Sequence, residues 1–218
     1  MKSTLFNMVA VLFCITLIAS AGVGGVYQLT AEPIAAANAA AVTEALRQVL
    51  PAFEETTEQE LTLDEMPITV YTATSQAATV GYAVKSMTKE GFGGVITMMV
   101  GFDMQGKILN VNVLSQAETP GLGTKMAEPE NVLLKSVRGK NPAEINLAVK
   151  KDGGDVDALT AATISSRAYV DAVARAYEAF TQVSGVGVDI DDPTGATDAA
   201  SGATETMSAD AQEGGENE

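Results

Sequence analysis

The sequence has 218 residues, a formal net charge of −15, one cysteine and no histidine. A single thiol and no imidazole exclude an intrachain disulfide, a cysteine-ligated zinc or iron–sulfur site, and the catalytic mechanisms that need a histidine. The acidic balance, without a basic stripe, also argues against nucleic-acid binding. Any redox chemistry in this chain must therefore come from an organic cofactor.

The N-terminal segment, residues 5–27, is mostly apolar. It is long enough for a membrane-spanning helix, which needs about 20 residues. Lys2 and the amino terminus carry the only positive charges before Arg47, so we expect a cytoplasmic N-terminus and an exported body. A cleaved signal peptide is the alternative, because Ala-Ser-Ala at residues 19–21 resembles a small-residue cleavage site.

The central part of the chain predicts one α+β domain, with a mixed or antiparallel sheet flanked by helices. Pro33 at a first helical position and the alanine-rich run after it predict a helix over residues 32–50. The acidic stretch 53–66 predicts a solvated connection. Alternating or continuous apolar residues then predict strands. These cover residues 68–72, 79–87, 94–102 and 108–113, the last two as a hairpin around a turn at residues 103–106.

A stretch of small and polar residues, 157–166, leads into the last predicted helix. Apolar residues three and four apart define that helix: Ile164, Ala168, Ala172, Val173, Ala176, Tyr177 and Phe180. Thr160 or Thr163 could cap its start through a hydroxyl. A helix start suits a phosphate, and Ala161 and Ala162 leave room for a bulky group to approach the backbone. On these features alone, an ordinary capped helix in an exported structural or interaction protein is the alternative.

Asp157-x-x-Thr160-Ala161-Ala162-Thr163 resembles the flavinylation motif of the FMN-binding domain family. That motif reads Asp, two variable residues, Ser or Thr, Gly or Ala, Ala, Thr. In the family, a separate flavin transferase attaches FMN to the last Thr through a phosphoester bond. The resemblance implies covalent FMN on Thr163, with Asp157, Thr160 and Ala162 as the other motif positions. Ala161 stands where Gly is commoner.

A second segment, residues 118–124, resembles the Glu-Thr-Pro-Gly-Leu-Gly loop of the G subunit of Rnf-type electron transport complexes and of the related C subunit of the sodium-pumping NADH:quinone reductase. The resemblance implies that this loop lies beside the flavin ring. Its candidate cofactor-binding residues are Glu118, Thr119, Gly121, Leu122, Gly123 and Thr124.

The implied function is electron transfer within a membrane complex that moves electrons between ferredoxin and NAD⁺ and couples this to sodium or proton transport. The implied partners are the other subunits of that complex, the flavin transferase and the membrane. The resemblance favours a retained anchor in the bacterial inner (cytoplasmic) membrane. A stand-alone exported FMN-binding redox or sensory module and the quinone-reductase subunit are the alternatives.

We therefore divide the chain into a transmembrane anchor (1–28), an FMN-binding domain (29–184) and an acidic tail (185–218). The tail is rich in Gly, Ala, Thr and Asp and lacks aromatic residues, a composition typical of disorder. It contains the pattern Asp-x-x-[Ser/Thr]-Gly-Ala-Thr twice, ending at Thr197 and Thr204. Low-complexity composition explains these repeats, and additional flavinylation at either threonine is the other hypothesis.

Overall fold

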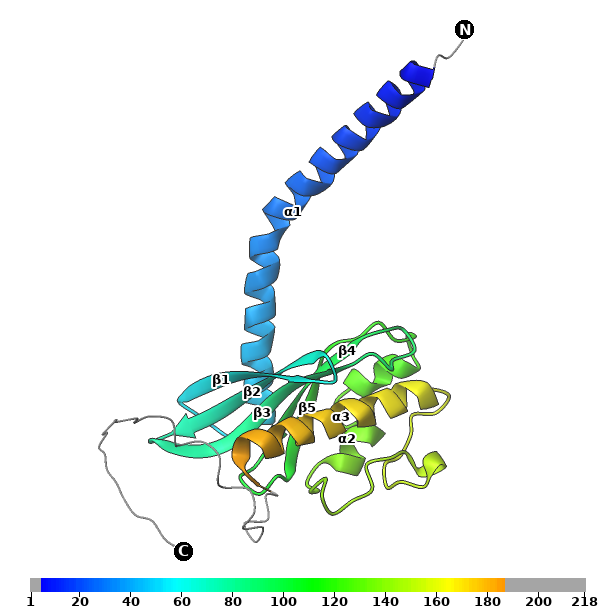
Figure 1. Ribbon diagram of the computed structural model, residues 1–218. Helices are drawn as coiled ribbons and strands as arrows, with labels where there is room; N and C mark the ends of the chain where they lie inside the picture. The colour runs from blue at the N-terminus through cyan, green and yellow to red at the C-terminus, as the bar shows by residue number, and fades with distance from the viewer. Residues whose placement is uncertain (1–4, 187–218) are drawn as a thin grey trace, which may run out of the picture. The chain divides into compact units, whose positions relative to one another are not determined.

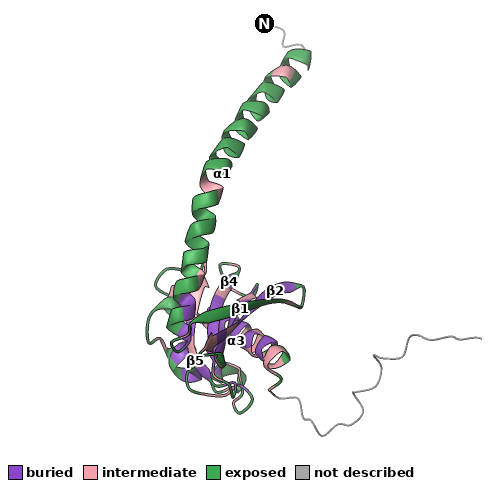
Figure 2. Cartoon of the chain, turned by 90° about the vertical axis from the view of Figure 1, so that its left-hand side faces the viewer, coloured by how far each residue is buried: buried purple, intermediate pink, exposed green. Residues whose placement is uncertain are grey.

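The computed structural model describes residues 5–186, and the tail repeats with Thr197 and Thr204 lie outside them. The first element, α1 (Leu5–Val49), is a single 45-residue helix (Figure 1). The predicted anchor and the predicted second helix are therefore one element, and Pro33 lies inside α1 instead of at a helix start. The N-terminal part of α1 is long and apolar enough to cross a membrane, and its side chains are exposed along this stretch (Figure 2).

Five strands form one antiparallel sheet in the order β1-β2-β3-β4-β5, so each strand pairs with the next along the chain. The strands are β1 (Glu55–Leu63), β2 (Met66–Ser75), β3 (Ala78–Thr88), β4 (Ile96–Phe102) and β5 (Ile108–Ser115). The prediction of an α+β domain whose sheet is flanked by helices is confirmed.

The strand β1 corrects the prediction of a solvated connection at residues 53–66. Nearly all of its side chains are exposed, so the segment lacks the alternating apolar pattern by which a strand is recognised. Its place in the sheet comes from backbone pairing with β2, from Glu55 opposite Thr74 to Leu63 opposite Met66.

Successive side chains of a strand point to opposite faces of the sheet. In this sheet, a helix packs against each of the two faces. On one face, Phe180 of α3 (Thr163–Ser184) stacks on Phe102 with ring centroids 4.9 Å apart and meets Tyr82 edge to face at 5.4 Å. The other face packs against the end of α1. Its buried cluster consists of Ala45, Leu46, Val49, Leu50, Tyr71, Ala73, Ala83 and Met99. Gly101 allows this close approach, since a Cβ there would lie 2.0 Å from the carbonyl oxygen of Val49.

The segment between β5 and α3 contains η1 (Gly123–Ala127), α2 (Val132–Val137) and η2 (Lys150–Asp152). Backbone hydrogen bonds fix it to the sheet: Gly139 N–H donates to the Ile108 carbonyl at 2.7 Å, and Ile108 N–H donates to the Lys140 carbonyl at 2.9 Å. The two ends of this segment are the loop after β5 and the turn before α3. Both ends meet at the N-terminus of α3, where the pocket described below lies.

Candidate functional site

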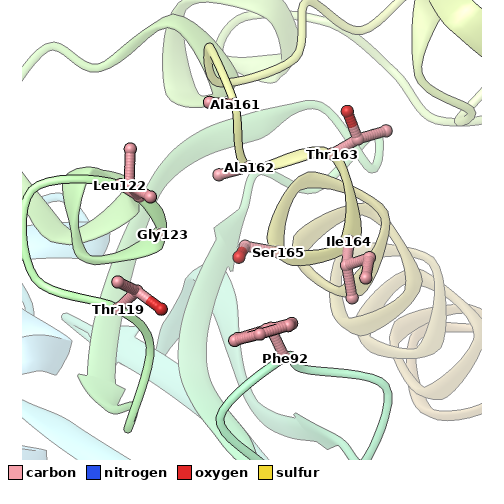
Figure 3. Close-up of a pocket in the computed structure, with 9 residues that line it drawn as sticks. All are labelled: Phe92, Thr119, Leu122, Gly123, Ala161, Ala162, Thr163, Ile164 and Ser165. Atoms are coloured by element: carbon pink, nitrogen blue, oxygen red, sulfur yellow. The ribbon is translucent and has the colours of Figure 1, made fainter.

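A pocket of about 350 Å³ lies at the N-terminus of α3 (Figure 3). Three segments form its walls: the β3–β4 loop around residue 92, the loop 118–124, and the turn 161–165 that begins α3. The lining residues are Phe92, Thr119, Leu122, Gly123, Ala161, Ala162, Thr163, Ile164 and Ser165. Its volume falls within the range of small-molecule sites, about 300–1,000 Å³.

Large apolar side chains at the edge of this pocket remain exposed. Phe92 is 66% exposed, Ile164 47% and Leu122 39%. Figure 3 shows Leu122 and Ile164 on opposite sides of the pocket. Ile164 corrects a prediction, because its spacing placed it in the buried stripe of α3. Exposed apolar groups around a concavity are typical of a ligand-binding groove.

The start of α3 differs from the predicted cap. Ala162 is the N-cap residue and no side chain caps the helix, so the prediction that Thr160 or Thr163 caps it is wrong. The first hydrogen bond of the helix runs from Ser166 N–H to the Ala162 carbonyl at 3.0 Å. The N–H groups before it have no carbonyl one turn earlier to bond. Thr163, the first helical residue, is half-buried at the pocket and takes no part in capping.

A tight turn precedes the helix and sets the position of Thr163. Ala162 N–H donates to the Leu159 carbonyl at 3.2 Å. Ala161 has a φ of 60°, in the left-handed region that favours glycine. The buried Ser166 hydroxyl holds the turn, accepting from Leu159 N–H at 2.9 Å and donating to the Ala162 carbonyl at 2.8 Å.

Glu118 joins the three walls of the pocket without lining it. The residue is only 4% exposed. Its Oε1 accepts from Gly93 N–H at 2.9 Å, and its Oε2 accepts from the Ser165 hydroxyl. Gly123 packs against this hydrogen bond between Ser165 and Glu118, since a Cβ at residue 123 would lie 2.5 Å from Ser165 Oγ and 2.7 Å from Glu118 Oε2. The carboxylate therefore ties the β3–β4 loop and the loop 118–124 to the first turn of α3.

Some predicted site residues line the pocket and others support its walls. Thr119, Leu122, Gly123, Ala162 and Thr163 line it. Gly121 and Thr124 instead fold the loop. The backbone of Gly121 has a φ of 75° and donates to Thr124 Oγ1 at 3.0 Å. The N–H groups of Leu122 and Thr124 both donate to the Thr119 carbonyl, at 3.1 and 3.4 Å. These N–H groups therefore form hydrogen bonds within the loop and are not available to a ligand in the pocket.

Two other motif residues lie outside the pocket lining. Thr160 is exposed within the turn. Asp157 accepts a hydrogen bond from Lys150 Nζ at 2.6 Å and another from the Ser136 hydroxyl at 3.3 Å. The hydrogen bond from Lys150 is the main reason that the pKa of Asp157 is lowered. Asp157 thus remains a carboxylate on the surface.

Sequence reasoning missed four residues of the site. Phe92, Ile164 and Ser165 line the pocket, and Lys151 Nζ donates a hydrogen bond to Thr163 Oγ1 at 3.1 Å. For Phe92 a signal existed, because an aromatic residue among the glycines of residues 91–94 has no periodic pattern that would bury it. The role of Ser165 depends on its contact with Glu118, a residue far away in the chain, and that of Lys151 on a contact across the irregular segment before α3.

Comparison with known proteins gives one consistent family. Residues 91–178 match the family described as FMN-binding domain, a range that contains every residue lining the pocket and also Lys151. The chain is 35% identical over 175 residues to the G subunit of the ion-translocating oxidoreductase complex of Shewanella amazonensis, covering 73% of this chain and 80% of that protein. It is 33% identical over 191 residues to the protein of the same name from Shewanella baltica, covering 81% and 89%. It is also 33% identical over 183 residues to that of Aliivibrio fischeri, covering 78% and 86%. This chain belongs to the family of G subunits of ion-translocating oxidoreductase complexes, the Rnf type.

Proposed function

We propose that this chain is the covalently flavinylated electron-transfer subunit of a membrane-bound Rnf-type ferredoxin:NAD oxidoreductase that is coupled to ion translocation. In this proposal FMN is held on Thr163 by a phosphoester bond. One observation carries it: the hydroxyl of Thr163, which does not cap α3, lies at the edge of a ligand-sized pocket. This pocket lies within the region that matches the FMN-binding domain family. FMN would supply the redox chemistry, accepting electrons from one carrier and passing them to another.

The residues around the pocket fit such a cofactor. Phe92, Leu122 and Ile164 offer apolar surface to a planar ring. The phosphate would lie at Thr163, beside the first turn of α3, where backbone N–H groups and the helix dipole favour an anion. Because these apolar side chains are also exposed, one edge of the pocket stays accessible to a neighbouring carrier. The ester bond would replace affinity, so that the cofactor cannot dissociate between rounds of electron transfer.

The likeness to G subunits also supports a place in the membrane. α1 is long and apolar enough to cross a bilayer once, and the relatives are subunits of ion-translocating complexes. The positive charge of Lys2, with no other basic side chain before Arg47, favours a cytoplasmic N-terminus and an FMN domain on the exported side. Protease added to spheroplasts should then digest the domain. Digestion only after lysis would overturn this orientation.

The attachment itself is tested by replacing the acceptor hydroxyl with a methyl group. The full chain is produced together with a flavin transferase, as wild type, as Thr163→Val, and as Thr181→Val, a threonine at the other end of α3. Wild type and Thr181→Val should retain flavin fluorescence after denaturing electrophoresis, and Thr163→Val should lose it. Because Thr163 caps nothing, Thr163→Val should keep its fold by circular dichroism. Covalent flavin on a folded Thr163→Val variant would rule out this assignment.

A further inference from the structure

Lys151 extends from η2 to the first residue of α3. Its ammonium group lies 3.1 Å from Thr163 Oγ1, although the lysine side chain is exposed. Holding a long, exposed side chain over one neutral hydroxyl costs conformational entropy and returns little free energy. A positive charge at this position would be stabilised more by an anion bound at the hydroxyl than by the neutral hydroxyl alone.

The cations beside Lys151 already have carboxylate partners. Lys150 binds Asp157 at 2.6 Å. Arg167, one turn into α3, makes two hydrogen bonds of 2.7 Å to the two oxygens of Asp152. Each of these charges is offset by a carboxylate at hydrogen-bonding distance, whereas the ammonium of Lys151 is hydrogen-bonded to the Thr163 hydroxyl and interacts with the Asp152 carboxylate only through space. The local arrangement therefore leaves one lysine to meet an anion at this position.

We propose that Lys151 binds the phosphate of the FMN attached to Thr163. The assignment rests on the proposed function and goes further, because it names the residue that balances the phosphate charge. A phosphodiester carries one negative charge, which a single ammonium matches. Lysine suits this role because it is a compact point charge on a flexible stem and binds phosphate without a fixed fork geometry. The phosphoryl oxygens of an ester on Oγ1 lie within reach of the same ammonium.

The same contact would assist attachment. In that step a bond forms between Thr163 Oγ1 and the phosphorus of an FMN-containing dinucleotide, and the hydroxyl proton is lost. The phosphoanhydride bond of the dinucleotide breaks and a nucleoside monophosphate leaves, with no change of oxidation state. Negative charge on the transferring phosphoryl group lies next to Lys151, which stabilises it electrostatically.

The first test measures attachment on the full-length chain in detergent, prepared without flavin. Chain, flavin transferase and flavin adenine dinucleotide are mixed, and intact mass follows the gain of FMN less water. Lys151→Gln should slow attachment about tenfold or more, and Lys151→Glu should slow it further. Lys151→Arg should restore most of the rate. Lys135→Gln makes the same charge change at an exposed site of α2 away from the pocket and should react like wild type.

A second measurement separates the contribution of the phosphate to binding from that of the ring, and it needs no transferase. Fluorescence titration compares FMN with riboflavin, which lacks the phosphate, on the unmodified chain. Wild type should prefer FMN, and Lys151→Gln should lose that preference while its riboflavin affinity stays the same. Wild-type rates and an intact FMN preference in Lys151→Gln would overturn the assignment of Lys151 and leave the proposed function standing. A wild-type chain that stays unmodified with active transferase would overturn the proposed function, and the assignment with it.

Discussion

Removing the Ser165 hydroxyl tests whether the Glu118 carboxylate holds the pocket walls together. Ser165 is 3% exposed and Glu118 4%, so solvent cannot replace the hydrogen bond to Oε2. Ser165→Ala would leave the carboxylate with its bond to Gly93 N–H alone. An unsatisfied buried acceptor costs about 1–3 kcal/mol, and a charged one more. At about 2–4 °C per kcal/mol for a domain of this size, Tm should fall by roughly 2–12 °C.

The assay is thermal unfolding of the full chain in detergent, followed by circular dichroism of the sheet. Ser115→Ala is the matched control, because Ser115 is exposed at the end of β5 and should change stability by less than about 0.5 kcal/mol. Glu118→Gln should lose less than Ser165→Ala, since its amide can accept from Gly93 N–H and donate to Ser165. If Ser165→Ala melts together with the Ser115→Ala control, Glu118 does not tie the walls together as argued.

Three further predictions concern the turn before α3 and the face of the sheet that packs against α1. Because Ala161 has a φ of 60°, Ala161→Gly should leave stability unchanged or raise it by up to about 1 kcal/mol, and Ala161→Val should lower it by at least ~1 kcal/mol; a valine variant that melts like wild type would contradict the left-handed turn. Burial, with the Glu58 carboxylate beside it, raises the pKa of Tyr71 to about 12, against about 10 in the unfolded chain. The stability that this shift contributes is complete below pH 10 and is lost as pH rises towards 12. In denaturant titrations, the free energy of unfolding of Tyr71→Phe should therefore decline less steeply with alkaline pH than that of wild type. Parallel declines in the two proteins would count against a raised pKa of Tyr71. Gly101→Ala would place a Cβ 2.0 Å from the Val49 carbonyl oxygen and should cost about 1–3 kcal/mol, with faster hydrogen exchange at the end of α1; unchanged exchange there would refute the close packing.

Much of the sheet could be predicted from the sequence, because its central strands carry their pattern in the chain itself. β4 is a nearly continuous apolar run and is buried on both faces, as such a run predicts. β1 carries no such pattern, because its outward side chains meet solvent and its pairing with β2 is made by the backbone. The continuity of α1 through Pro33 was missed for another reason. Proline is favoured at helix starts, yet α1 continues through Pro33, at the cost of one backbone hydrogen bond and a clash of the ring with the preceding turn.

For the site, the sequence predicted the segments and the structure supplied their connections. The motif and the loop 118–124 were recognised by resemblance, and both reach the same pocket. Glu118 was a candidate either to contact the cofactor or to orient its loop. In the structure it joins the walls, because its partners Gly93 and Ser165 come from opposite sides of it in the chain. Lys151 lies twelve residues before Thr163. No periodicity links two positions across an irregular segment, so only the folded chain brings them together.

The most direct test of flavin attachment is intact-mass and peptide mass spectrometry on the protein taken from its native membrane. The predicted result is a mass gain of FMN less water on the peptide that contains Thr163, and the same peptide map reads Thr197 and Thr204 in the tail. An unmodified Thr163, in cells shown to contain an active flavin transferase, would contradict the covalent flavin carrier proposed for this subunit.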